Sequence, residues 1–278
     1  MSSVVVRTLS RELHLRTNSP DVHAALMCLN TEPRLPGRDL TPIVLDVEEA
    51  GSFFRLCLPG LQPAEGSLET IATAVHRQIG IWWVEEFGHL PILHAGTAAI
   101  DGRRIAFIGD GRAGKTTLML RLIQEGFAVQ GDEYLLITAN GAISSPRCLH
   151  VKETSLEMLP DLADRIRSLP FLTDWVGNIT YACPPSFTGV EWTIAEEPVD
   201  ELIFLEPNFG GSSVLSRFAR EHAFLRMMQS LFIPTAGRAR AVARLRKLAL
   251  DCHCWRLQTG NLDQAIDRLR RLVSKGYG

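Results

Sequence analysis

Residues 104–116 of the chain read RIAFIGDGRAGKT, and they carry the clearest structural signal in the sequence. The apolar run Arg104 to Ile108 is typical of a buried strand. Glycines at positions 109, 111 and 114 then predict a tight turn, and the stretch from Thr116 to Glu125 predicts a helix that Gly126 ends. The order strand, glycine-rich turn, helix favours an α/β protein.

The turn fits the pattern G-x-x-x-x-G-K-[ST]. In this pattern glycines let backbone N–H groups curl around a phosphate, and the helix N-terminus adds unpaired donors. Lys115 would reach the β- and γ-phosphates of ATP, and the Thr116 hydroxyl would ligate Mg²⁺. A chance lysine in an ordinary turn is the alternative, but only 4 of the 29 basic residues are Lys. Arg112 is either a further phosphate contact or a solvated charge. The predicted ATP-binding residues are Gly109, Asp110, Gly111, Arg112, Ala113, Gly114, Lys115, Thr116 and Thr117.

Two polar features flank this turn in the sequence. Asp132-Glu133 begins 17 residues after Lys115, with one helix and one short strand between them. The carboxylates are therefore expected at the C-terminal edge of the sheet, where they could ligate Mg²⁺ or accept a hydroxyl proton. His94 lies 21 residues before Lys115 on an apolar strand. The alternative for Asp132-Glu133 is an ordinary polar turn between strands, and the alternative for His94 is a histidine buried in the core.

Asp101-Gly102 lies between two apolar runs, Pro91 to Ile100 and Arg103 to Ile108. This arrangement predicts a β-hairpin with a positive φ at both central residues. The hairpin would place the strand that carries His94 directly beside the strand that leads into the glycine-rich turn.

Taken together, these motifs resemble the catalytic domain of the HPr serine kinase/phosphorylase family. The likeness is strongest to its divergent kinase branch, some members of which accompany peptide-modification systems such as lasso-peptide clusters. It covers roughly residues 90–138 well and extends weakly through 147–153 and 254–266. The segments that carry it are Leu93-His94-Ala95, Asp101-Gly102, the turn at 109–116 and Gln130-Gly131-Asp132-Glu133.

The resemblance implies a role for each matching residue. Asp132 would be the catalytic aspartate that positions or deprotonates the acceptor hydroxyl, and His94 the active-site histidine. Lys115 would hold the phosphates, and Thr116 and Glu133 would lie at the Mg²⁺ ion. The family often forms hexamers, which implies a homo-oligomer here. The His-x-Glu-Ile-Arg-Gly signature of bifunctional members is missing from this sequence. That departure argues against reverse phosphorylase activity and against HPr as the substrate.

The sequence therefore predicts an ATP- and Mg²⁺-dependent kinase that phosphorylates a hydroxyl. A serine of a peptide or protein is the favoured acceptor, in the manner of a kinase that tailors a ribosomally made, lasso-type peptide. A small-molecule kinase acting on free serine or a sugar is one alternative. A nucleotide-binding sensor without transfer activity is the other.

Composition narrows the remaining possibilities. The 278 residues are 46% hydrophobic, which excludes disorder, and 29 basic residues against 31 acidic ones argue against a nucleic-acid partner. No apolar run is long enough to cross a membrane, the first 16 residues lack a signal-like apolar region, and the six cysteines form no CxxC pair. We therefore expect a cytoplasmic protein without a membrane partner.

The pattern of apolar and polar residues changes near residue 88, so two domains are expected. Residues 1–88 would form a small α+β domain, and residues 89–278 an HPr-kinase-like P-loop core with a mixed sheet. Within the second domain, residues 154–168 predict one helix and residues 170–185 a loop-rich segment.

Overall fold

The computed structural model describes residues 1–57, 62–173, 178–232 and 237–275. The chain folds into two compact units. Unit 1 comprises Met1–Glu86 and Pro146–Pro184, and unit 2 comprises Phe87–Ser145 and Pro185–Gly278. This division differs from the expected domains 1–88 and 89–278 by two residues at the first boundary and in residues 146–184, which return to unit 1.

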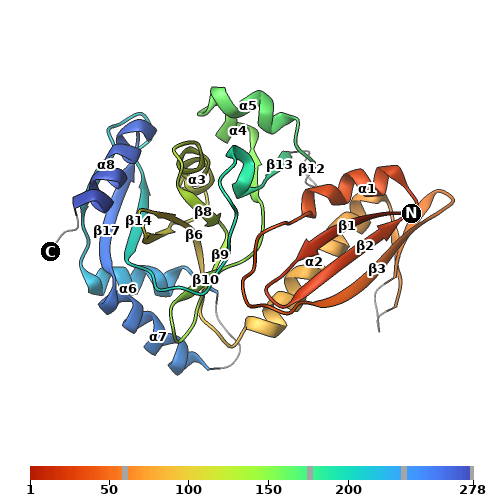
Figure 1. Cartoon of the computed structure of the whole chain (residues 1–278), viewed down its shortest axis with the longest axis horizontal. Coiled ribbons are helices and arrows are strands. Elements are labelled where there is room, and N and C mark those ends of the chain that lie inside the picture. Colours follow the sequence, from red (N-terminus) through yellow and green to blue (C-terminus); the bar gives the residue numbers. More distant parts are fainter. Residues whose placement is uncertain (58–61, 174–177, 233–236, 276–278) are drawn as a thin grey trace. The chain divides into compact units, whose positions relative to one another are not determined.

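The first part of unit 1 is a mixed sheet accompanied by two helices (Figure 1). The strand order is β1-β2-β3-β4-β5, with β2 and β3 parallel and the other neighbours antiparallel. Alternate residues of β1 and β2 are buried, as expected for strands with one face in a core. The elements are β1 (Ser2–Arg7), β2 (Arg11–Thr17), α1 (Pro20–Leu26), β3 (Thr41–Ala50), β4 (Phe53–Cys57), β5 (Ala64–Gly66) and α2 (Leu68–Phe87).

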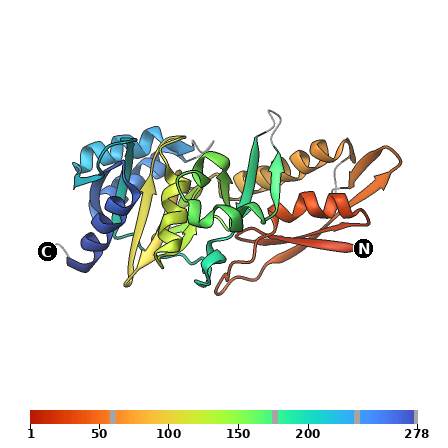
Figure 2. The ribbon, with the colours of Figure 1, turned by 90° about the horizontal axis from the view of Figure 1, so that it is seen from above.

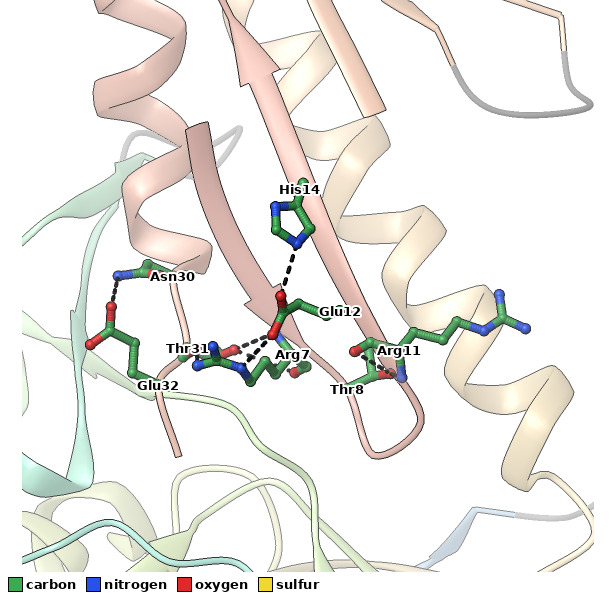
Figure 3. Close-up of polar contacts among 8 residues, drawn as sticks. All are labelled: Arg7, Thr8, Arg11, Glu12, His14, Asn30, Thr31 and Glu32. Carbon is green, nitrogen blue, oxygen red and sulfur yellow. Dashed lines mark hydrogen bonds and ion pairs between the residues drawn. The ribbon is translucent and has the colours of Figure 1, made fainter. Parts of the chain in front are cut away.

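Polar side chains tie together the end of the β1–β2 hairpin (Figure 3). The Arg7 Nε donates to Glu12 Oε2 at 2.9 Å, and His14 Nε2 lies 2.8 Å from Glu12 Oε1. Burial opposes ionisation of Glu12, but the hydrogen bonds from Arg7 and His14 outweigh it and lower the pKa of the carboxyl. Glu12, which alternates with the buried leucines of β2, thus pairs with both Arg7 and His14.

The second part of unit 1 corrects two local predictions. Pro160 lacks the N–H that a continuous helix needs, so residues 154–168 form two helices, α4 (Glu153–Leu156) and α5 (Pro160–Arg167). The segment expected to be loop-rich instead contains β12 (Phe171–Thr173) and β13 (Ile179–Cys183), which pair with each other, and β13 also pairs with β11 (Leu149–Lys152). Strands β12 and β13 pack against the 3₁₀ turn Met27–Leu29, which explains the return of this segment to unit 1.

Unit 2 is built on a mixed sheet with the order β10-β9-β6-β7-β14-β17-β15. Strands β7, β14 and β17 are parallel, whereas β6 is antiparallel to β7 on one side and to β8 and β9 on the other. The strands are β6 (Ile92–Ile100), β7 (Arg103–Ile108), β8 (Ala128–Gly131), β9 (Tyr134–Ile137), β10 (Ala142–Ser144), β14 (Glu201–Pro207), β15 (Val214–Arg217), β16 (Leu231–Phe232, paired with β6) and β17 (His253–Thr259).

Helices cover both faces of this sheet (Figure 1). Helices α6 (Arg220–Gln229) and α7 (Arg238–Asp251) bury Ala223, Met227 and Leu245 against one face. Helix α3 (Lys115–Gln124) contacts β6 and β8, and α8 (Leu262–Lys275) contacts β15 and β17. Figure 2 shows the β6–β7 hairpin in yellow beside α3. The predicted α/β class with a mixed sheet is confirmed.

The predicted hairpin turn is also confirmed. Asp101 has φ +50° and Gly102 has φ +74°, and β6 and β7 pair from Ile100 with Arg103 to Ala95 with Ile108. In the described part of the chain, no helix is both long and apolar enough to span a membrane. Nor do the described residues gather three or more His, Cys, Asp or Glu side chains into a cluster that could hold a metal ion.

Candidate functional site

The glycine-rich turn joins the end of β7 to the start of α3. Its backbone turns left-handed at Arg112, with φ +67°, and again at Gly114, with φ +81°, directly before the helix. A Cβ on Gly109 would lie 3.1 Å from the Ala113 Cβ and 3.2 Å from the Leu205 Cβ, so only glycine fits this position without displacing neighbours. The loop therefore curls tightly, and the first turn of α3 faces it with N–H groups that have no acceptor within the helix.

Lys115 is a buried cation at the centre of this loop. Its side chain is only 6% exposed, and Nζ donates to the Gly109 carbonyl oxygen at 2.9 Å. Burial lowers the pKa of Lys115, although the carboxylates of Asp132, Glu133 and Asp110 oppose that effect. An anion in the loop would relieve this desolvation, because it would supply the ammonium with a charged partner.

Thr116 and Asp132 meet directly, although 16 residues separate them. The Thr116 Oγ1 donates to the Asp132 Oδ2 at 2.7 Å, and Asp132 is 8% exposed. The two side chains bring a hydroxyl and a carboxylate oxygen together, and both are ligand types that Mg²⁺ prefers. These residues therefore fit a Mg²⁺ ion.

The register of β6 explains why Asp132 lies there. Gly131 pairs with Thr97 and Tyr134 pairs with His94, so the bend at Asp132-Glu133 lies between these two pairs, beside Gly96 and Ala95 of β6. A Cβ on Gly96 would lie 2.8 Å from the Met119 sulfur, which shows that the Met119 side chain of α3 packs directly over Gly96.

His94 lies at the same end of the sheet. It comes one residue before Ala95, the partner of Ile108 at the end of β7, and therefore lies beside the start of the turn. The side chain is exposed, but partial desolvation of the ring and then the charge of Lys115 lower its pKa, while Glu133 and Asp110 oppose them. The ring is accordingly neutral at pH 7.

The remaining predicted residues occupy the rim of the loop. Asp110 and Arg112 are exposed, and the Asp110 Oδ2 lies 3.4 Å from Arg226 Nη2 of α6. Glu133 is half-buried and acts on Lys115 and His94 through its charge. The assignment of Glu133 to the metal stays a prediction, and its neighbour Asp132 accepts the Thr116 hydrogen bond. Arg226 was not anticipated, because nothing distinguishes it in sequence from the other arginines of the chain.

Comparisons with known proteins give a distant similarity to solved structures alone. No protein-family profile matches the chain. No curated protein sequence matches it either. Among solved structures, the chain is similar to the Hpr(Ser) kinase/phosphatase from Coxiella burnetii, with 14% identity and a TM-score of 0.31 over 66% of this chain and 99% of that one. Because the similarity is so distant, the chemistry of the site has to follow from its own contacts.

Proposed function

We propose that unit 2 is an ATP-dependent kinase, with a P-loop at residues 109–117, that transfers the γ-phosphoryl group of ATP to a hydroxyl. The observation that carries this proposal is the 2.7 Å hydrogen bond from Thr116 to Asp132. It places an acidic side chain from the β8–β9 segment against the first helical turn after a glycine-rich loop. An ordinary strand–helix turn does not need a buried lysine and a buried aspartate at this place.

Each residue has a distinct task in this reaction. Lys115 binds and orients the β- and γ-phosphates, exchanging the Gly109 carbonyl for phosphate oxygens. Thr116 and Glu133 are the residues that would hold Mg²⁺, which when bound would neutralise charge on the phosphate oxygens. An oxygen–phosphorus bond forms to the acceptor while the bond between the β- and γ-phosphates breaks and ADP leaves. Asp132 takes the proton of the acceptor hydroxyl.

The exposed ring of His94 is placed beside the loop, and we assign it to orienting the acceptor. Its pKa is lowered, so at neutral pH the ring offers one N–H donor and one acceptor nitrogen. Because the His94 ring is neutral, it adds no positive charge to that of the Lys115 ammonium.

We propose a serine of a peptide or protein as the acceptor, with a ribosomally made peptide of the lasso type as the favoured case. This choice rests on the sequence motifs around His94, Lys115 and Asp132. Free serine and sugars are the competing acceptors.

The test is incubation of the purified full chain with Mg²⁺·ATP and candidate acceptors, followed by mass spectrometry. The expected product is a peptide that gains the mass of one phosphoryl group. Lys115→Ala and Asp132→Asn should abolish or strongly reduce this gain. The matched controls are Lys247→Ala and Asp267→Asn, because both side chains are exposed on helices of unit 2. ATP binding without transfer to any acceptor would contradict the kinase and favour a nucleotide sensor.

A further inference from the structure

An exposed aromatic side chain stands beside the glycine-rich turn. Phe209 follows β14 and is 70% exposed. Its Cε1 atom lies 3.9 Å from the position that a Cβ on Gly114 would occupy, which is van der Waals distance. The ring therefore borders the turn next to Lys115 and leaves most of its surface open to solvent. Leaving so large an apolar surface in water is unfavourable unless something covers it.

The loop that presents Phe209 is fixed by hydrogen bonds. A Cβ on Gly260 would lie 2.1 Å from the Gly211 oxygen, so the loops after β14 and β17 touch backbone to backbone. The bonds that hold them are Asn208 N to Thr259 O (2.8 Å), Asn208 Nδ2 to Ser212 O (2.9 Å), Ser213 Oγ to Asn261 O (2.7 Å) and Gly260 N to Ser213 Oγ (2.9 Å). These bonds tie the backbone on both sides of Phe209 to the loop after β17.

The sheet topology places this loop next to the turn. Strands β7, β14 and β17 are parallel neighbours, so their C-terminal ends gather at one edge of the sheet. Residues 109–114 follow β7, and residues 208–213 follow β14. A ligand whose phosphates occupy the first loop has its uncharged end within reach of the second.

We propose that Phe209 is the platform on which the base of the nucleotide stacks, which rests on the proposed function of residues 109–117. The Asn208 Nδ2 and the hydroxyls of Ser213 and Thr259 already bind backbone oxygens of the surrounding loops. The base is therefore held by its π-face more than by its edge. Because stacking tolerates any large aromatic base, ATP and GTP should bind with similar affinity and CTP more weakly.

The test is titration calorimetry of the full chain with ATP, GTP, CTP and inorganic tripolyphosphate, each with Mg²⁺. Phe209→Ala should weaken ATP and GTP about 5- to 100-fold and leave tripolyphosphate unchanged, since tripolyphosphate has no base to stack. Phe209→Trp should keep the affinity for ATP. Leu250→Ala is the matched control, because Leu250 is 50% exposed but lies just before β17, at the opposite edge of the sheet.

Three results would overturn the inference. Unchanged ATP affinity in Phe209→Ala would show that no base stacks there, and would leave contact with a protein partner as the use of this ring. Equal losses of ATP and tripolyphosphate would show that Phe209 only supports the phosphate loop. Failure of the wild-type chain to bind either ATP or tripolyphosphate would overturn the proposed function, and this inference with it.

Discussion

Replacing Lys115 by Met should make unit 2 more stable and less able to bind ATP. The side chain is 6% exposed, and its ammonium has one hydrogen bond, 2.9 Å long, to a neutral carbonyl. Although three carboxylates act on it, burial still lowers its pKa below 10.5. The charge is thus held at a net cost in free energy, which methionine removes while keeping the aliphatic stem. We expect the free energy of unfolding to rise by ~1 kcal/mol without nucleotide.

The pH dependence of this effect has a definite sign. At a pH below both the folded and the unfolded pKa of Lys115, the cost is fully present. It disappears as the pH rises through the lowered folded-state pKa toward 10.5, because the unfolded chain then binds the proton more tightly than the folded chain. The advantage of Lys115→Met over the wild type should therefore shrink as the pH rises toward 10.5.

Urea unfolding measured with and without Mg²⁺·ATP separates the two effects. The wild type should gain stability from ATP, and Lys115→Met should bind it at least about tenfold more weakly, because a charged hydrogen bond to phosphate is lost. Lys247→Met, which removes an exposed lysine paired with Asp251, should change stability by less than about 0.5 kcal/mol. A Lys115→Met protein that is less stable than the wild type, or that binds ATP equally well, would refute the reasoning.

Further changes test the remaining parts of the site and its support. Asp132→Asn should lower the transfer rate by a factor of about 10² or more with little change in ATP affinity, measured by steady-state kinetics. The transfer rate of the wild type should stay constant above pH 6.5 and fall at lower pH as His94 gains a proton. In His94→Gln this fall should move to the more acidic range in which carboxylates titrate. Gly96→Ala should cost about 1 kcal/mol of stability, because the new methyl group would lie 2.8 Å from the Met119 sulfur and 3.2 Å from the Gly131 carbonyl oxygen. Arg104→Met should cost about 3 kcal/mol in urea unfolding, since the buried Arg104 guanidinium binds Gln130 Oε1 and two backbone carbonyls. A change within about 0.5 kcal/mol, the usual spread of neutral surface substitutions, would contradict the last two expectations.

Much of unit 2 could be predicted because its signals are local. The Asp101-Gly102 turn depends on two φ angles, and the end of α3 depends on Gly126. Of the two errors, the helix break at Pro160 has a local cause that the sequence contains, whereas the other arose where distant residues decide the structure. The strand pair β12–β13 is short, and it gains its stability from packing against residues near Leu29, more than 140 positions earlier, for which the sequence of 170–185 contains no signal.

The candidate site shows the same contrast. Lys115 and Thr116 were recognised because a phosphate loop needs fixed residue types at fixed spacing. Asp132 and His94 stood out only through their distances from Lys115. Phe209 and Arg226 could not be singled out, because an exposed aromatic residue or an arginine acquires meaning only when the sheet brings it beside the loop.

A small residue on β6 connects the fold to the proposed chemistry. Because β8 and β9 pair with β6 in one register on either side of Asp132-Glu133, these two residues lie along the strand edge and not beyond its end. The Thr116 hydroxyl of α3 meets the Asp132 carboxylate of this segment at 2.7 Å. Gly96 on the neighbouring β6 leaves room there for the Met119 side chain of α3. The site therefore depends on the pairing of β8 and β9 with β6 as much as on the loop itself.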